Sequence, residues 1–267
     1  MSEQQDVIAE LGEAGVLAGV RWAYLSATSR SLETYSDDDG HDAAWLGNTR
    51  FTLFRNRLDR VFGCERYAVS SGNGDADLDQ LYAELSDVDI DSMPRLYPML
   101  VRRSNLNGSP GWAHGRRRFL LASCMFGKLD KLPWPQKSPT KRLVAQQNDP
   151  EPSQPSLFEG FADEEIGGLE AALTAGRDLD LATFVIAHSL DSLSQEVELV
   201  FGRARLNTGG GQAWHWRQDL LSAPPADGGR RTDDRPLPAE PNTVPDAPVR
   251  LRRPAEEQPR EQASGEW

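Results

Sequence analysis

An abrupt change in composition near residue 222 sets the strongest limit on how this chain can fold. Residues 222–267 contain nine of its 18 prolines, together with mixed charges and few large apolar side chains. A segment of this kind buries too little apolar surface to offset the entropy lost when it becomes ordered. We therefore expect a disordered tail over residues 222–267. The folded body is then a single unit over residues 1–221, which is long enough to enclose a hydrophobic core.

The bulk properties narrow the class of protein further. Charged residues make up 26% of the chain and hydrophobic residues 38%, which is typical of a soluble protein. No apolar run reaches the roughly 18 residues of a membrane helix, and the first residues lack the features of a secretory signal. We expect a cytoplasmic protein with no membrane partner. Because Cys64 and Cys124 are the only cysteines, a disulfide framework and a four-cysteine zinc site are both excluded.

Apolar residues recur at helical spacing in the N-terminal part of the chain. The pattern predicts one or two helices over residues 3–35 and a stronger helix over residues 42–62. In the stronger helix, apolar residues from Phe51 to Phe62 form a buried stripe. Arg50, Arg57 and Arg60 lie toward another face of the same helix.

The remainder of the body reads as strands and turns. The apolar run 119–126 predicts a buried strand, and a meander follows over residues 183–190, 196–206 and 213–217. Prolines between the run and the meander predict a linker or long loop near residues 133–155. We therefore expect an α+β fold with N-terminal helices and a small antiparallel β-sheet that ends in the C-terminal meander.

Charge is distributed in two opposed segments. The basic segment, residues 101–142, has ten basic residues and one acid, while the acidic segment, residues 67–94, has seven acids and no Lys or Arg. Cations near aromatic side chains suit phosphate contacts and base stacking on a nucleic acid. The predicted nucleic-acid site is Arg116, Arg117, Arg118, Trp134, Lys137, Lys141 and Arg142. The alternative is that the acidic segment lies against the basic segment within the fold.

A short apolar pair interrupts the predicted linker. Gln154-Pro155-Ser156-Leu157-Phe158 follows a proline-rich stretch. These five residues resemble the peptide by which bacterial proteins of DNA metabolism bind the replication sliding clamp. The resemblance implies a partner site in which Leu157 and Phe158 enter an apolar pocket and Gln154 bonds to its rim. The alternative is that Leu157 and Phe158 pack onto the protein's own core.

A third pattern lies just before the stronger helix. Asp39, His41 and Asp42 combine carboxylates with an imidazole, as in metal-dependent hydrolases. Their spacing matches no metal-site signature, and acids at this position also cap a helix. We prefer the capping role. The sequence therefore assigns no catalytic residue, no metal ligand and no cofactor.

Three functional hypotheses follow from these patterns. The leading one is a non-enzymatic accessory protein of DNA transactions, which binds nucleic acid through the basic segment and a sliding clamp through Gln154–Phe158. The second is a protein–protein adaptor or regulator with a bipolar charged surface. The third is a metal-dependent hydrolase.

Overall fold

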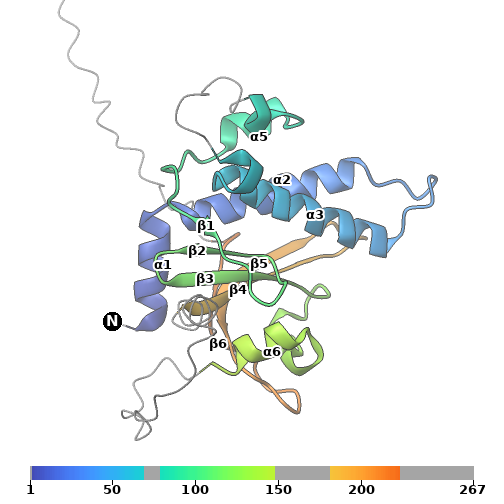
Figure 1. Ribbon diagram of the computed structural model, residues 1–267. Coiled ribbons are helices and arrows are strands. Elements are labelled where there is room, and N and C mark those ends of the chain that lie inside the picture. The colour runs from blue at the N-terminus through green and yellow to red at the C-terminus, as the bar shows by residue number, and fades with distance from the viewer. Residues whose placement is uncertain (1, 69–78, 148–180, 223–267) are drawn as a thin grey trace, which may run out of the picture. The chain divides into compact units, whose positions relative to one another are not determined.

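Three N-terminal helices and a six-stranded sheet dominate the part of the chain that the structure describes (Figure 1). This computed structural model describes residues 2–68, 79–147 and 181–222. The chain divides into two units, Met1–Arg230 and Arg231–Trp267, and every described residue belongs to the first.

The N-terminal helices begin and end where local chemistry directs. Helix α1 (Glu3–Glu13) starts at a capping box formed by Ser2 and Gln5. Gly15, with φ of 74°, turns the chain into α2 (Val16–Glu33). Helix α3 (Ala43–Val61) starts at Asp42, whose carboxylate accepts the backbone N–H of Trp45 at 2.7 Å. The predicted N-terminal helices are thus confirmed. None of the helices in the described ranges is long and apolar enough to cross a membrane.

The sheet is mixed rather than wholly antiparallel. Its strands lie in chain order: β1 (Arg102–Arg103), β2 (Gly111–His114), β3 (Arg117–Ser123), β4 (Ala182–Leu190), β5 (Val197–Ala204) and β6 (Trp214–Asp219). Neighbouring strands are antiparallel except β3 and β4, which pair in parallel from Arg117↔Ala182 to Ser123↔His188. The α+β class and the C-terminal meander are confirmed. The parallel pair places the carboxyl ends of β3 and β4 at one edge.

Both faces of the sheet are covered, because side chains alternate along each strand. On β3, Phe119 and Leu121 join the apolar cluster with α1, α2 and α3, whereas Leu120 and Ala122 join a second cluster on the opposite face. Short helices cover that second face: η2 (Leu129–Lys131), η3 (Trp134–Gln136) and α6 (Pro139–Ala145). Figure 1 shows the three N-terminal helices on one side of the sheet and α6 on the other.

Residues 134–145, which we predicted as part of a linker or loop, form η3 and α6. The prolines explain this difference, because proline fits the first turn of a helix. Pro139 is the first residue of α6, and the Ser138 hydroxyl caps the helix by accepting the N–H of Lys141. Two further short helices, η1 (Glu65–Tyr67) and α5 (Asp87–Ser92), lie between α3 and β1 in the sequence.

Candidate anion-binding site

The aromatic side chain and two of the six cationic side chains predicted to bind nucleic acid lie inside the protein. Trp134 is fully buried and donates its indole N–H to the carbonyl of Ala213 at 2.6 Å. Arg118 is buried and donates to the Ser104 hydroxyl at 2.9 Å, and Lys141 is also buried. Burial and the neighbouring Lys137 lower the pKa of Lys141 to about 8. Trp134 is therefore not at the surface to stack on a base.

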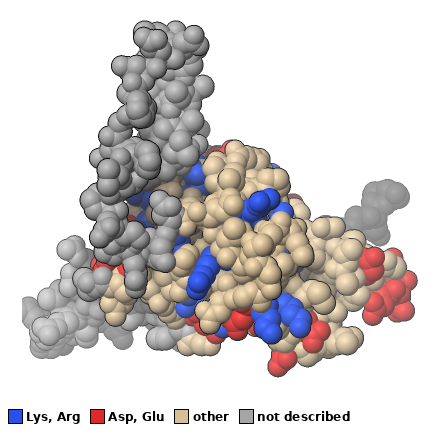
Figure 2. Space-filling view, turned by 90° about the horizontal axis from the view of Figure 1, so that it is seen from below, with Lys and Arg blue, Asp and Glu red and all other residues tan. Residues whose placement is uncertain are grey.

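The other predicted cations do not gather into one surface. Arg117 forms an ion pair with Glu10 of α1 at 2.9 Å, while Arg116 and Arg142 are exposed. In the described part of the face drawn in Figure 2, Lys and Arg form separate groups between uncharged areas and acidic side chains. Glu10 does not belong to the acidic segment. The +9 basic segment thus produces no continuous basic band on this face.

Lys137 instead lies at a pocket that the sequence did not indicate. The pocket, of about 630 Å³, opens between the first half of α3 and the carboxyl ends of β3 and β4. Its lining includes two cations and no Asp or Glu: Ala43, Ala44, Leu46, Gly47, Asn48, Arg50, Phe51, Ser123, Cys124, Met125, Lys137, Leu190 and Ser192. We call it the Arg50 pocket. The carboxyl edge of parallel strands is where ligands of α/β sheets commonly bind.

Arg50 is the unusual residue of this pocket. Its side chain is only 5% exposed, and neither Nε nor Nη1 has a hydrogen-bond partner among the described residues. Its nearest compensation is the ring of Tyr24, whose centroid lies 6.0 Å from Cζ. Burial lowers the pKa of Arg50 below its ordinary value, yet a guanidinium stays charged in proteins. Within the described part of the chain, the pocket therefore holds a buried positive charge with no carboxylate in its lining.

Two other arginines of α3 show what a buried guanidinium looks like when the protein satisfies it. Arg57 donates to the Ser26 hydroxyl at 3.0 Å and to the side chain of Asn56 at 3.2 Å. Arg60 donates to Asn56 at 2.9 Å and to the carbonyls of Gln80 and Leu81. The hydrogen bonds of Arg57 and Arg60 therefore serve the fold. Among the described residues, Nε and Nη1 of Arg50 have no such acceptors, although Arg50 lies on the same helix.

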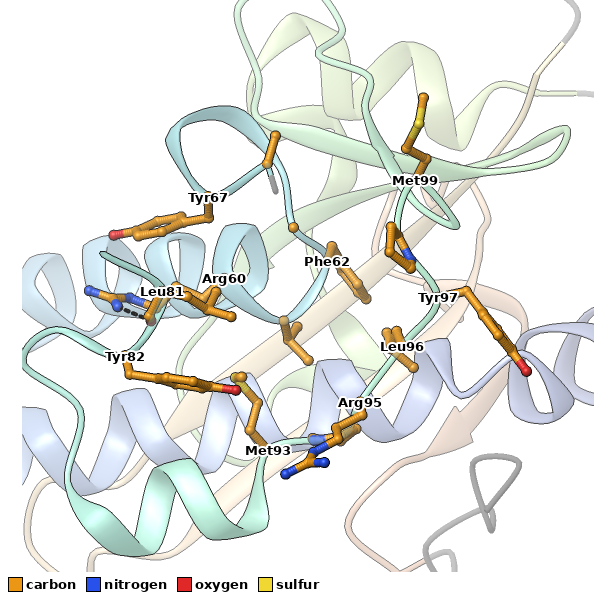
Figure 3. A pocket seen from close by; sticks show the side chains of 15 residues that line it. Arg60, Phe62, Tyr67, Leu81, Tyr82, Met93, Arg95, Leu96, Tyr97 and Met99 are labelled. Atoms are coloured by element: carbon orange, nitrogen blue, oxygen red, sulfur yellow. Dashed lines mark hydrogen bonds between the residues drawn. The ribbon is translucent and has the colours of Figure 1, made fainter. Parts of the chain in front are cut away.

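Arg60 lines a second, smaller pocket of about 210 Å³ (Figure 3). Its guanidinium lies over the Tyr67 ring, 4.5 Å from the centroid, and bonds to Leu81. Tyr82, Met93 and Leu96 form much of the remaining wall in Figure 3. Arg60 is already satisfied by protein acceptors, and the other arginine of the lining, Arg95, is exposed to solvent. The Arg50 pocket is the better candidate.

The first turn of α3 adds to the positive character of the Arg50 pocket. Ala43 and Ala44 line the pocket and are the first two residues of the helix. Their backbone N–H groups have no acceptor within the helix, and they lie at the positive end of its dipole. Lys137 is half-buried and held in place by a 2.9 Å bond from Nζ to the carbonyl of Ser123. This set of donors suits an anion.

The groups near the pocket that titrate are poorly suited to catalysis. Burial, reinforced by Glu198, raises the pKa of the Cys124 thiol to about 11, so little thiolate forms near neutral pH. His188, on β4, is fully buried, and its ring packs against the rings of Tyr24 and Phe54. Burial, with Arg50 and Lys137, lowers the pKa of His188 to about 3. Cys124 lines the pocket but is protonated near neutral pH, and His188 is buried away from solvent.

The predicted hydrolase residues have structural contacts. Asp42 caps α3, and the His41 ring stacks on Trp45 with centroids 3.7 Å apart. His41 also accepts the backbone N–H of Ser36 at 3.1 Å, and the N–H of Asp39 bonds to the Ser36 hydroxyl. Among the described residues, no group of three or more His, Cys, Asp and Glu side chains is arranged to hold a metal ion. Gln154, Leu157 and Phe158 lie outside the described residues.

Comparison with protein-family models, with curated proteins and with solved structures finds no match for this chain. Of the predicted site residues that the structure describes, only Lys137 lines the Arg50 pocket. Arg50 was placed on the correct helix and away from the apolar stripe, but no sequence signal separated it from Arg57 and Arg60.

Proposed function

We propose that this protein is a non-enzymatic binding protein for phosphate-bearing ligands, with nucleic acid as the ligand class, and that the ligand's phosphate occupies the Arg50 pocket. The observation that carries the proposal is the buried guanidinium of Arg50, whose Nε and Nη1 lack partners among the described residues. A charge removed from water is costly unless an opposite charge or several hydrogen bonds compensate for it. A bound phosphate supplies both, because its oxygens accept charge-assisted hydrogen bonds.

The local charge supports an anion rather than a neutral ligand. The whole chain carries a net charge of −12, yet the pocket lining combines Arg50 and Lys137 with no carboxylate. The first turn of α3 adds the positive end of a helix dipole. A pocket lined by one sign of charge concentrates ligands of the opposite sign.

Nucleic acid is proposed because Lys137 connects the pocket to the basic segment. Two further members of that segment, Arg116 and Arg142, are exposed. The proposal places the protein among accessory proteins of DNA transactions. Recruitment to a sliding clamp through Gln154–Phe158 remains part of this proposal.

The pocket is tested by fluorescence anisotropy with labelled single- and double-stranded DNA over a series of salt concentrations. Phosphate contacts predict affinity that falls steeply as salt rises. Arg50→Gln should weaken binding by about 10-fold or more, the effect of losing charge-assisted hydrogen bonds. Arg142→Gln is the matched control, since it removes the same charge from an exposed position on α6. Its effect should be no more than about 3-fold, as for one outer phosphate contact.

Two results would contradict the proposal. Absence of DNA binding at low salt would remove nucleic acid as the ligand class. Equal binding by Arg50→Gln and the wild type, with both shown to be folded by circular dichroism, would remove the pocket. Clamp recruitment is tested separately, by comparing capture on an immobilised sliding clamp of the wild type and of Leu157→Ala/Phe158→Ala. Equal capture would exclude the peptide.

A further inference from the structure

We infer that the Arg50 pocket recognises a terminal phosphate, meaning a phosphomonoester at the end of a strand or on a nucleotide, rather than a phosphodiester inside a strand. This inference rests on the proposed function, because it names which phosphate of the ligand enters the pocket. Three features of the described residues lead to it: the depth of Arg50, the number of positive charges, and the space beside Gly47.

The depth of Arg50 limits which phosphates can reach it. The side chain is 5% exposed and its Nε and Nη1 atoms are shielded from solvent, so a phosphate has to approach the part of the side chain that lines the pocket. A phosphodiester inside a strand carries a sugar on each side, so only its two free oxygens can approach, and only along an open surface. A terminal phosphate has one ester bond and three free oxygens. It can enter a recess with its oxygens leading.

The charge of the pocket matches a dianion. Arg50 and Lys137 supply two positive charges, and no Asp or Glu contributes to the lining. A phosphomonoester carries between −1.5 and −2 at neutral pH, because its second pKa lies near 6. An internal phosphodiester carries only a single negative charge. Ala43 and Ala44, at the N-terminal end of α3, also line the pocket, and the Asp42 carboxylate caps the same end of the helix.

The wall of the pocket beside Arg50 leaves room for a terminal phosphate. Gly47 lies one turn before Arg50 on α3, and no heavy atom of another residue lies within 4 Å of the position that a Cβ would take. Across the pocket, Lys137 is fixed by its bond to the carbonyl of Ser123. A terminal phosphate bound to Arg50 would thus lie between a glycine wall and an oriented ammonium group.

The experiment compares one single-stranded DNA sequence with a 5′-phosphate, a 3′-phosphate or hydroxyls at both ends, by anisotropy with wild type, Arg50→Gln, Arg50→Lys and Arg142→Gln. A phosphorylated end should bind about 10-fold tighter than the hydroxyl form. Arg50→Gln should abolish that preference, Arg50→Lys should keep part of it, and Arg142→Gln should keep it in full. Competition by a nucleoside monophosphate and by inorganic phosphate then distinguishes a strand end from a small phosphate ligand.

The outcomes separate this inference from the proposed function. Equal affinity for phosphorylated and unphosphorylated strands, with loss of both in Arg50→Gln, overturns the terminal-phosphate inference and leaves the proposed function standing. Binding of the nucleoside monophosphate but of no strand supports terminal-phosphate recognition and overturns nucleic acid as the ligand. Binding of no strand, no nucleoside monophosphate and no inorganic phosphate overturns both.

Discussion

Arginines that are equally deep in a protein can differ in what compensates for their charge. On α3, Arg57 and Arg60 donate to side-chain and carbonyl oxygens, whereas Nε and Nη1 of Arg50 have no acceptor among the described residues and its guanidinium lies 6.0 Å from the centroid of the Tyr24 ring. Replacing a buried charge by an apolar side chain of similar size is often neutral or stabilising. The unfolding free energies of arginine variants therefore report whether each guanidinium serves the fold or a ligand.

Arg50→Met should raise the free energy of unfolding of the ligand-free protein by about 1 kcal/mol, because it removes an uncompensated buried charge. Arg57→Met is the matched control and should lower it by about 1–3 kcal/mol, since its acceptors Ser26 and Asn56 lose a donor. Urea unfolding followed by circular dichroism measures both. Added inorganic phosphate should stabilise the wild type but not Arg50→Met. A marked loss of stability in Arg50→Met would show that protein contacts hold this residue.

His188 makes stability depend on pH. Burial, with Arg50 and Lys137, lowers its pKa in the folded protein from 6.5 to about 3. Between these values the unfolded chain binds a proton at His188 and the folded chain does not, so the free energy of unfolding falls as pH falls. Titration of His188 leaves the free energy of unfolding unchanged above about pH 6.5 and lowers it progressively below that pH. By about pH 5 the loss from this residue should be about 2 kcal/mol.

His188→Leu tests this assignment, because leucine does not titrate and both ring nitrogens of His188 lack hydrogen-bond partners among the described residues. Urea unfolding of both proteins at several pH values gives the comparison. The decrease in stability from about pH 7.5 to about pH 5 should be smaller in the variant by about 2 kcal/mol. Identical pH profiles would mean that the imidazole is not kept neutral by burial.

At the scale of elements, α3 has one position where stability and binding should change in opposite directions. Gly47 lies within the helix, lines the Arg50 pocket and has open space where a Cβ would be. Gly47→Ala should raise the free energy of unfolding by about 0.5–1 kcal/mol, because alanine favours the helix. The added methyl group should also narrow the pocket and weaken the wild-type preference for a phosphorylated strand.

The opposed changes are measured on the same sample, by urea unfolding and by DNA anisotropy. Gly40→Ala is a control at a glycine outside the pocket; its φ of 80° makes alanine strained, so stability should fall while binding stays unchanged. A more stable Gly47→Ala that binds as well as the wild type would exclude the ligand from this wall of the pocket.

The elements themselves were largely predictable, because their signals are local. Apolar residues at helical spacing located α1, α2 and α3, and alternating or continuous apolar runs located β3 to β6. The parallel pairing of β3 with β4 was not predictable, since no local pattern specifies the direction of a strand's neighbour across a long connection. The Arg50 pocket depends on that pairing and on Lys137 and α3, so its residues meet only in the folded chain.

At the scale of the whole molecule, the alternation of side chains along a strand explains why the net charge of the basic segment did not predict a basic surface. Arg117 and Arg118 are adjacent on β3, yet Arg117 pairs with Glu10 of α1 and Arg118 bonds to Ser104. Neighbouring strand residues point to opposite faces, so a run of cations is divided between the two sides of the sheet. A net charge summed along a sequence therefore indicates a binding surface only when the run lies on one face.

The expected boundary of the folded body near residue 222 can be tested by truncating the chain. Among the residues that the structure describes, the members of the two apolar clusters run from Val7 to Leu221. At the end of β6, the Asp219 carboxylate accepts hydrogen bonds from the N–H groups of Leu221 and Ser222 and from the Ser222 hydroxyl, which closes the hydrogen bonding of the last strand.

A chain ending at Ser222 should keep its free energy of unfolding within about 0.5 kcal/mol of the full-length protein, as expected when no core contact is lost. A chain ending at Ala213 loses β6, with the buried Trp214 and Leu220, and should not unfold cooperatively. Calorimetry and urea unfolding of the three chains decide the matter: a loss of about 2 kcal/mol or more on cutting at Ser222 would require that residues 223–267 contribute to the folded body.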